Sequence, residues 1–598
     1  MPRMAARESG PGESLDAAPA PQADSYPALD VPLKSALARA THGISPAAVS
    51  AAMLDWWSHL LASPGKQVAL AESAVQKTLR WGLFVQQAAL GDCSPCVTPA
   101  PHDKRFARPQ WQQWPYREWS QAFLLWEQWW HEAGTGVRGV THHHEEVASY
   151  VLRQAVDISS PSNYVTSNPE VLQETLASGG QNLLRGAANW WRDAMAVATD
   201  GRPKDAEQFA PGRAVATTPG KVVFRNRLIE LIQYAPAHRQ VHPEPVLVVP
   251  SWIMKYYILD LSPHNSMVKY LVERGHTVFM MSWRNPGAEQ RDLAMEDYVQ
   301  LGVFAALAAV RRILPRAPVH AMGYCLGGTL LAIAAAALAR DGRSPLKTVS
   351  LLAAQIDFED PGELGLFIDE SQIAFLDDVM AERGYLDGRQ MAGAFALINS
   401  KDLVWSKLVR EYLMGAQTPL TDLRAWNADA TRMPARMHGE YLRRLYLHND
   451  LAEGRFPVGE HPVAVRDIAQ PMYVVATERD HVSPWRSVYK MHLLTDGALR
   501  FVLTSGGHNV GIVNPPSGPG ASAQATFRAA DRRAHAGYRD PEAWFDSTTP
   551  QRGSWWTDWA DWLAARSGRK VHAPAFGGTG ARRLEPLDDA PGRYVHES

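Results

Sequence analysis

The most reactive side chain of the sequence is Cys325, in the stretch GYCLGG at 323–328. The apolar run PVHAMGY precedes it, and the helix-like run LGGTLLAIAAAALA follows it. A nucleophile flanked by glycines at a sharp strand-to-helix turn is a nucleophile elbow, here with cysteine where serine is common. The glycines leave room for the strand and the helix, and the helix N-terminus stabilises negative charge on the sulfur. The pattern therefore predicts a cysteine that attacks a substrate covalently.

A cysteine nucleophile needs a base, and the base needs a carboxylate that orients it. In elbow enzymes the acid and then the histidine follow the nucleophile along the chain. Downstream of Cys325 the strand-like run PMYVVATERD ends in Asp480, and the next one, LRFVLTSGGH, ends in His508. Both residues lie where a strand leaves the carboxyl edge of a sheet, where active sites of such sheets form. We therefore predict a catalytic triad of Cys325, Asp480 and His508.

Four other side chains could compete for the roles of base and acid. His481 adjoins Asp480, but successive residues of a strand point to opposite faces, so a supporting or substrate-contacting role fits it better. His438 and His448 fall in a predicted lid and are expected at the surface, whereas Asp260 precedes the nucleophile and breaks the expected order.

Acyl-transfer chemistry at a cysteine also needs an oxyanion hole, which backbone N–H groups usually provide. One donor should be the residue that follows the nucleophile, Leu326. The second should come from the loop Pro250-Ser251-Trp252-Ile253 after an earlier strand, and we predict the N–H of Ile253.

The elements that must position these residues form an alternating pattern. Between residues 245 and 508, short apolar runs such as PVLVVPS, HTVFMMSW and TVSLLAAQIDF alternate with helical patterns, which indicates a mostly parallel sheet with helices on both faces. GKVVFRNRLIELIQYAP (220–236) predicts a preceding pair of strands. Amphipathic helices over 359–470 interrupt the alternation and predict a lid. Together with the elbow, this pattern predicts an α/β-hydrolase fold over residues 216–570.

The two ends of the chain differ from this centre. Residues 1–40 are predicted to be a disordered tail, and residues 571–598, rich in Gly, Pro and Arg, a loosely ordered one. Residues 41–215 show helical periodicity and carry 11 of the 21 tryptophans. These indoles could fill a helical core, or some of them could face a partner or a hydrophobic product.

Composition excludes several classes of protein. With 60 Lys+Arg against 62 Asp+Glu and a net charge of −2, there is no electrostatic case for binding nucleic acid or an anionic membrane. Three cysteines in 598 residues do not form a disulfide scaffold, and the N-terminus shows no secretory signal. The longest apolar run, 329–339, is too short to span a membrane. We therefore expect a cytoplasmic protein.

The sequence gives little reason to expect a metal or a cofactor. Cys93 and Cys96 have the spacing of a zinc half-site or a redox pair, but no matching pair accompanies them. The run HHHEE at 142–146 is better explained as the start of a helix, because consecutive helical residues cannot converge on one ion. No phosphate-loop or dinucleotide motif is present.

Several longer motifs resemble one family, the poly(3-hydroxyalkanoate) synthases, which polymerise (R)-3-hydroxyacyl-CoA into storage polyester. The motifs are WIMKYYILDLSPHNSMVKYLVERGHTVFMMSWRNP (252–286), GYCLGGT, KDLVW (401–405), WNADATRMP (426–434), ERDHVSPW (478–485), GGHNVGIVNPP (506–516) and GSWWTDW (553–559). The resemblance begins near residue 90 and is to the long single-subunit, class I-like type. It places the family's catalytic residues on Cys325, Asp480 and His508, and it implies a homodimer attached to polyester granules.

The resemblance and the triad imply one reaction and leave two alternatives. In the implied reaction, Cys325 takes the acyl group of (R)-3-hydroxyacyl-CoA, with 3-hydroxybutyryl-CoA as the expected substrate, and CoA is released. The 3-hydroxyl of a further unit then attacks the thioester. A cysteine-type acyl-CoA thioesterase of the same fold would use water as the acceptor instead. A non-catalytic protein that binds the polymer granule through its tryptophans is the third possibility.

Overall fold

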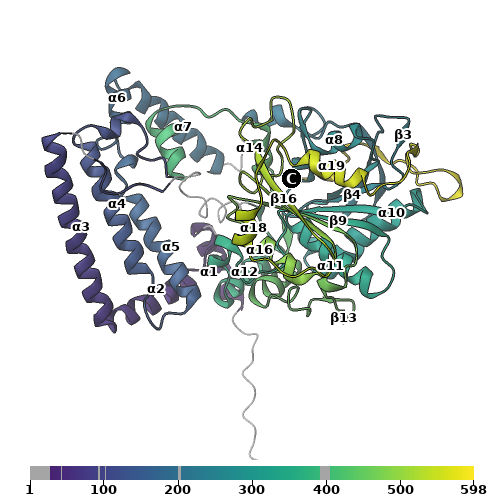
Figure 1. Cartoon of the computed structure of the whole chain (residues 1–598), viewed down its shortest axis with the longest axis horizontal. Coiled ribbons are helices and arrows are strands. Elements are labelled where there is room, and N and C mark those ends of the chain that lie inside the picture. Colours follow the sequence, from purple (N-terminus) through teal and green to yellow (C-terminus); the bar gives the residue numbers. More distant parts are fainter. Residues whose placement is uncertain are drawn as a thin grey trace, which may run out of the picture.

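The computed structural model describes residues 27–41, 43–91, 94–100, 103–198, 204–388, 390 and 404–598. It has a helical N-terminal part beside a larger α/β part that contains the predicted nucleophile (Figure 1). Within the described residues, no helix combines the length and the hydropathy needed to cross a lipid bilayer.

The α/β part is built on a central sheet whose middle is parallel. Among the described residues its strand order is β17-β16-β15-β14-β9-β8-β4-β7-β2-β1-β19. Neighbouring strands from β15 to β7 pair in parallel, whereas the strands at both edges pair antiparallel. The strands are β1 (Gly220–Arg225), β2 (Ile229–Tyr234), β4 (Val246–Val249), β7 (Val278–Trp283), β8 (Val319–Tyr324), β9 (Leu346–Leu352), β14 (Met472–Thr477), β15 (Leu499–Thr504), β16 (Thr526–Arg532), β17 (Gln551–Arg552) and β19 (Asp588–Asp589).

Helices cover both faces of this sheet, which explains why its central strands are mostly apolar and are buried at nearly every position. Figure 1 shows α8 and α19 on one side of the sheet and α10 and α11 on the other. The helices of this part are α8 (Met267–Glu273), α9 (Met295–Asp297), α10 (Ala305–Ile313), α11 (Leu326–Arg340), α16 (Trp485–Tyr489), α17 (Met491–Leu494), α18 (Pro541–Ser547) and α19 (Trp556–Ala564). This is the α/β-hydrolase arrangement that the alternating pattern predicted, and 220–236 forms the expected strand pair β1–β2.

The insertion at 359–470 leaves the sheet after β9 and returns at β14, its neighbour in the sheet. Its described part is mostly helical, as the amphipathic pattern predicted: η7 (Gly362–Phe367), α12 (Glu370–Arg383), η9 (Leu408–Leu413), α14 (Asp422–Asn427), α15 (Ala435–Tyr441) and η10 (Leu442–Leu447). Met437 and Leu445 of this insertion are fully buried in the same core as the sheet. The insertion is therefore docked on the sheet rather than detached from it.

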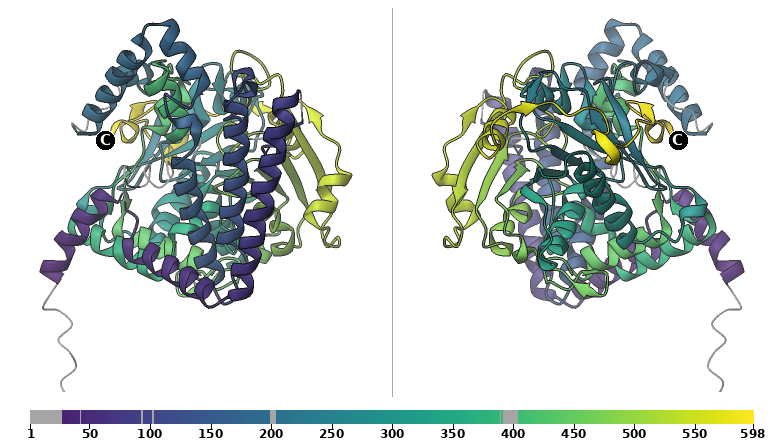
Figure 2. Two further views of the ribbon diagram at one scale, coloured as in Figure 1. Left: turned by 90° about the vertical axis from the view of Figure 1, so that its left-hand side faces the viewer. Right: turned by 90° about the vertical axis from the view of Figure 1, so that its right-hand side faces the viewer.

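The N-terminal part has a hydrophobic core of its own, which includes Trp111 and Phe123. In Figure 2 its long helices run side by side as a layer against the α/β part. The helices are α2 (Pro46–Leu61), α3 (Pro64–Leu90), α4 (Tyr116–Gly134), α5 (His142–Ile158), α6 (Pro169–Ala177) and α7 (Gln181–Ala198).

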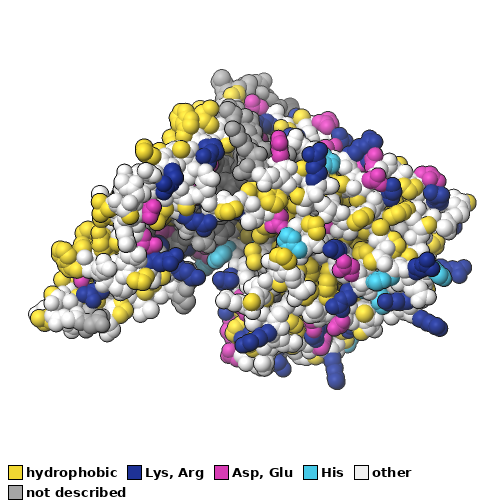
Figure 3. Space-filling model, turned by 90° about the horizontal axis from the view of Figure 1, so that it is seen from above, with side chains coloured by type: hydrophobic (Ala, Val, Ile, Leu, Met, Phe, Trp, Pro, Cys, Tyr) yellow, Lys and Arg dark blue, Asp and Glu magenta, His cyan; other side chains and the backbone are white. Residues whose placement is uncertain are grey.

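Some tryptophans of this part fill its cores, as one interpretation predicted, and others are exposed. Trp56 and Trp111 are buried in its cores, whereas other indoles are exposed: Trp57, Trp114, Trp119, Trp126, Trp190 and Trp191. Viewed from above, hydrophobic side chains gather on the outer edge of the helical part (Figure 3). Along α3 they include Val68, Val75, Leu79 and Leu83.

Two predictions about the ends of the chain need correction. Residues 1–26 lie outside the described residues, but α1 (Pro27–Ala40), placed in the tail by the sequence, is a helix that packs on α12. Ala38 of α1 is buried against Phe375 and Val379 of the lid, and Lys34 forms an ion pair with Asp378. The sequence did not predict this helix because its buried contact is small and is made with a segment distant in the sequence.

The C-terminal segment 571–598 is also ordered rather than loose. β18 (Val571–His572) pairs with β3 (Gln240–Val241), and β19 extends the main sheet beside β1. The buried carboxylate of Glu230 accepts hydrogen bonds from the backbone N–H groups of Arg593 and Tyr594, at 2.9 and 3.0 Å. Polar anchoring of this kind leaves no hydrophobic period in the sequence, which is why composition predicted a loose tail.

Candidate active site

Cys325 occupies the turn between β8 and α11, as the elbow motif predicts. Its φ is +53°, a backbone conformation that costs energy for any residue except glycine and that is typical of functional turns. Its backbone N–H donates to the carbonyl of Leu352 at 2.8 Å, which holds the turn against β9. A Cβ on Gly323 would lie 2.4 Å from the Cα of Gly328, and one on Gly327 would lie 2.2 Å from the carbonyl oxygen of Val249. The glycines are therefore required by close backbone contact.

Asp480 and His508 come together at the ends of adjacent parallel strands. Asp480 follows β14 and His508 follows β15, and the His508 Nδ1 atom lies 2.8 Å from Asp480 Oδ2. The other carboxylate oxygen, Oδ1, accepts the backbone N–H groups of Val482 and Ser483, at 2.9 and 2.8 Å. The Thr477 hydroxyl donates to Oδ2 at 3.0 Å. These bonds fix the carboxylate and, through it, the orientation of the imidazole.

Electrostatics favour a charged His508 beside the sulfur. Burial disfavours the imidazolium, but the negative charges of Asp480 and Cys325 and the hydrogen bonds with both outweigh it, so the pKa of His508 is raised well above its ordinary value. Burial likewise disfavours the Asp480 carboxylate. The charge and hydrogen bond of His508 and the N–H groups of Ser483 and Val482 outweigh it, so the pKa of Asp480 is lowered. His508 thus interacts with both the carboxylate of Asp480 and the sulfur of Cys325.

The predicted oxyanion donors lie close to the nucleophile. Leu326 is the first residue of α11, where a helical N–H has no partner within the helix, and Ile253 lies in the loop after β4. Both residues line the same cavity as Cys325. Thr431 of the lid holds this loop, because its backbone N–H donates to the Ile253 carbonyl at 3.1 Å and its hydroxyl to the Trp252 carbonyl at 2.6 Å.

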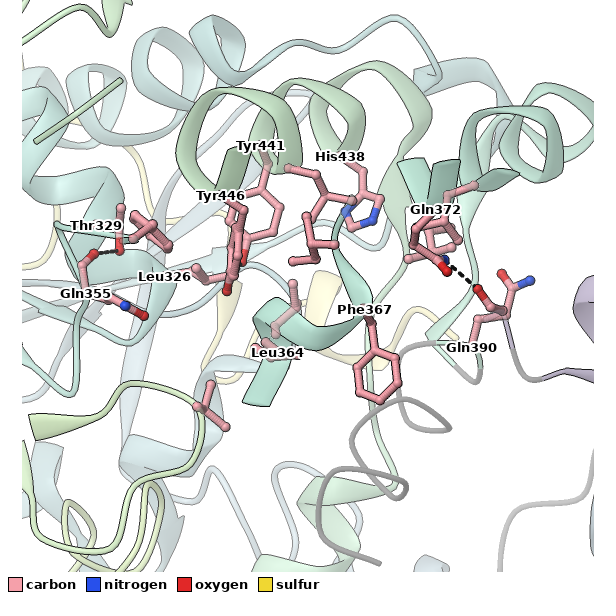
Figure 4. A pocket seen from close by; sticks show the side chains of 18 of the residues that line it. Leu326, Thr329, Gln355, Leu364, Phe367, Gln372, Gln390, His438, Tyr441 and Tyr446 are labelled. Atoms are coloured by element: carbon pink, nitrogen blue, oxygen red, sulfur yellow. Dashed lines mark hydrogen bonds between the residues drawn. The ribbon is translucent and has the colours of Figure 1, made fainter. Parts of the chain in front are cut away.

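The cavity above Cys325 has a volume of about 100 Å³ and is lined mainly by apolar side chains. Most of its wall comes from the lid, including Leu376, Leu442 and Tyr446, while Gly43 and Ile44 contribute from the N-terminal part. Figure 4 shows Leu326 and Tyr446 toward one end and Gln372 toward the other. The cavity can therefore hold an apolar chain that extends from the sulfur under the lid.

The four side chains that competed for the roles of base and acid lie in different environments. His448 is exposed, as expected for the lid, and His481 is exposed beside Asp480. Asp260 is buried in a separate polar cluster, where it accepts the hydroxyl hydrogen bonds of Thr218 and Ser266. The surface position predicted for His438 is wrong. Its side chain is 2% exposed and lines the cavity, because the face of α15 that carries it is turned toward Cys325.

The remaining metal candidates do not form a site among the described residues. Cys93 lies outside them, so the Cys93–Cys96 pair is not described. The histidine run is a helix start, as predicted: α5 begins at His142, and Thr141 caps it by accepting the backbone N–H of His144. The ring of His144 bonds Asp55, with Nδ1 and Oδ2 2.6 Å apart.

Comparison with known proteins identifies the family. Residues 102–271 match the family model for the poly-beta-hydroxybutyrate polymerase (PhaC) N-terminus, residues 24–66 match one for the poly-beta-hydroxybutyrate polymerase N terminal region, and residues 244–515 match the alpha/beta hydrolase fold. The poly(3-hydroxyalkanoate) polymerase of Methylorubrum extorquens is 40% identical over 504 residues, which cover 84% of this chain and 82% of that protein. This chain belongs to the poly(3-hydroxyalkanoate) polymerase family.

Other relatives in this polymerase family are similarly close. The poly(3-hydroxyalkanoate) polymerase subunit PhaC of Cupriavidus necator is 37% identical over 508 residues, which cover 83% of each chain. Among solved structures, the monoglyceride lipase of Saccharomyces cerevisiae aligns with 60% of this chain and 99% of its own, at 12% identity and a TM-score of 0.35. As a member of the polymerase family, the chain is an enzyme of the acyltransferase type on the α/β-hydrolase fold.

Proposed function

We propose that this enzyme polymerises (R)-3-hydroxyacyl-CoA, with 3-hydroxybutyryl-CoA as the expected substrate, into a polyester and releases CoA. The observation that carries the proposal is the position of His508, which bonds Asp480 at 2.8 Å and interacts with the sulfur of Cys325, a residue that lines an apolar cavity. The names of its relatives supply the substrate class.

Acylation is the first half of the proposed reaction. The Cys325 sulfur, having given its proton to His508, attacks the thioester carbonyl of the acyl-CoA. The oxygen of the tetrahedral intermediate is stabilised by the N–H groups of Leu326 and Ile253. The carbon–sulfur bond to CoA then breaks, and the His508 imidazolium protonates the departing thiolate. The acyl group remains on Cys325 as a thioester.

Chain extension is the second half. His508, now neutral and oriented by Asp480, takes the proton of a 3-hydroxyl group as that oxygen attacks the Cys325 thioester. An oxoester forms and the sulfur is released. A cysteine suits this sequence, because exchange of one thioester for another keeps the acyl group activated, whereas an oxoester on serine would be a poorer acyl donor. The apolar lid supports polymerisation over hydrolysis, since it limits the access of water to the thioester.

The test supplies (R)-3-hydroxybutyryl-CoA to the full chain and follows turbidity and free thiol together. We expect both to rise. Cys325→Ala should abolish both signals, and His508→Gln should slow CoA release by about 10³-fold or more. The matched control is Cys96→Ala, because Cys96 packs against the core of the helical part. CoA release without turbidity would instead support a thioesterase, and polymer formed by Cys325→Ala would exclude the proposed nucleophile.

The assembly of the enzyme belongs to the same proposal. We expect a homodimer in the cytoplasm, bound at polyester granules through the exposed indoles of the helical part, such as Trp57, Trp190 and Trp191. Sedimentation should show a dimer. Binding to polyester particles should weaken when Trp190 and Trp191 are replaced by Ser, while CoA release from a soluble substrate should persist. A granule-binding protein without catalysis would show the binding and no CoA release.

A further inference from the structure

The cavity contains one imidazole that the proposed chemistry does not use. His438 lies on α15 of the lid and is 2% exposed. Within the described part of the chain, its buried Nδ1 atom has no hydrogen-bond partner. Burial lowers the pKa of His438 to about 3, so the ring is neutral at physiological pH and has one N–H donor and one acceptor nitrogen. A neutral imidazole that lines a cavity and has unused hydrogen-bonding capacity can bond a polar group of a chain held there.

Other polar groups of the cavity wall already have partners in the protein. The Gln372 amide accepts the backbone N–H of Ser45 and donates to the carbonyl of Gly43, both at 2.7 Å. The Thr329 hydroxyl donates to the carbonyl of Gln355 at 2.7 Å. The Tyr441 hydroxyl donates to that of Tyr446 at 3.2 Å. His438 differs from these groups because its Nδ1 atom has no hydrogen-bond partner among the described residues.

The position of His438 suits an acyl chain held on Cys325. In Figure 4 the ring lies on the lid side of the cavity between Tyr441 and Gln372, and it contacts the ring of Tyr441. Tyr441 and Tyr446 lie close enough to Cys325 for the charge of its sulfur to act on their hydroxyl groups. His438 precedes Tyr441 by about one helical turn on α15. In Figure 4 it lies farther than the tyrosines from Leu326, the residue after Cys325. A chain leaving the sulfur therefore passes the tyrosines before it reaches the imidazole.

We propose that His438 binds an oxygen of the acyl chain beyond the thioester carbonyl, and so selects 3-hydroxyacyl chains over plain hydrocarbon chains. This inference rests on the proposed function. A 3-hydroxyacyl unit has a hydroxyl at its third carbon, and a two-unit chain adds an ester carbonyl farther from the sulfur. Either oxygen can bond a neutral imidazole, whereas a hydrocarbon would offer the ring no hydrogen-bond partner. Because the ring is neutral, the anionic phosphates of CoA are a poorer match for it.

The experiment measures single-turnover CoA release with enzyme in excess for two matched pairs of substrates. The first pair is (R)-3-hydroxybutyryl-CoA and butyryl-CoA, which differ in the hydroxyl. The second is the two-unit 3-hydroxybutyryl-3-hydroxybutyryl-CoA and octanoyl-CoA, which differ in the ester group and the terminal hydroxyl. The quantity compared is the ratio of rate constants within each pair, because a general loss of activity cancels in the ratio.

Three variants make the test specific to hydrogen bonding. His438→Phe keeps a ring but removes both polar nitrogens, and it should reduce one of the two ratios by about tenfold, the effect of one hydrogen bond. His438→Gln keeps a donor and an acceptor and should restore most of that ratio. The matched control is His492→Phe, at a buried histidine packed on Tyr489 away from the cavity, and it should keep both wild-type ratios.

Each outcome has a separate meaning. A fall in the first ratio assigns the contact to the hydroxyl, and a fall in the second alone assigns it to the ester carbonyl. Unchanged ratios in a folded His438→Phe protein would overturn the inference. If that variant does not fold, His438→Leu and His438→Gln provide the same comparison, and equal ratios in those two would overturn it. If the wild-type enzyme releases CoA from no acyl-CoA, the proposed function itself is wrong.

Discussion

Acid should destabilise this enzyme through a group of neighbouring histidines, and His276 tests the cause. His276 is 1% exposed, and neither of its ring nitrogens has a hydrogen-bond partner among the described residues. Its ring stacks on His242 with centroids 4.7 Å apart and lies edge-on to His320 at 6.5 Å. Burial, with repulsion from these neighbours and Lys570, lowers the pKa of His276 to about 3. The pKa of His320 is lowered to about 4, mainly by burial.

The lowered pKa of His276 determines both the sign and the size of the change in stability with pH. The folded protein requires a neutral His276, whereas the unfolded chain binds a proton below pH 6.5. The contribution to stability is therefore complete above pH 6.5 and is lost as the pH falls toward 3. Between pH 7.5 and pH 5 the loss is about 2 kcal/mol for this one group. Because pH 5 lies well above the pKa of His276 in the folded protein, the size of this loss depends mainly on the pKa of His276 in the unfolded chain.

The assay compares urea unfolding of the wild type and His276→Phe at pH 7.5, 6 and 5, followed by circular dichroism. Phe keeps a ring between His242 and His320 but cannot take up a proton. The variant should lose about 2 kcal/mol less than the wild type over this range. His131→Phe, at an exposed position, is the control and should follow the wild type. Parallel pH curves for wild type and His276→Phe would refute the reasoning.

Backbone contacts at glycines give three further predictions. Gly327→Ala places a Cβ 2.2 Å from the carbonyl oxygen of Val249, so CoA release should fall at least 100-fold, an estimate that follows from misplacing the nucleophile. Gly186→Ala on α7 places a Cβ 1.7 Å from the carbonyl oxygen of Tyr412. This variant should lower the free energy of unfolding, measured in urea, by about 1–3 kcal/mol. Gly82→Ala on α3 meets nothing within 4 Å and should raise that free energy by about 1 kcal/mol. If both helix variants changed stability alike, close contact would not be the cause.

The position of the candidate site was predictable from the sequence because each of its three proposed catalytic residues has a local signature. Cys325 has its glycines and its strand-to-helix switch, and Asp480 and His508 each end a recognisable strand. The geometry brings all three together as the chain order suggested. The orientation of His438 was not predictable, because which face of α15 meets the cavity depends on how the lid docks. Ordered α1 and the ordered segment 571–598 were missed for a related reason, since their partners are distant in the sequence.

The loop Gly43–Ser45 limits which fragments of the chain can keep the cavity closed. This loop is tied to α12 by both ends of the Gln372 amide, and Gly43 and Ile44 form part of the cavity wall. The reaction chamber is thus shared between two parts of the chain that look independent in the sequence. A catalytic fragment that began at the first strand of the sheet would have an opening on this side. In the proposed reaction, water entering there would compete with the 3-hydroxyl group, so the fragment would shift from making polymer toward hydrolysing its own thioester.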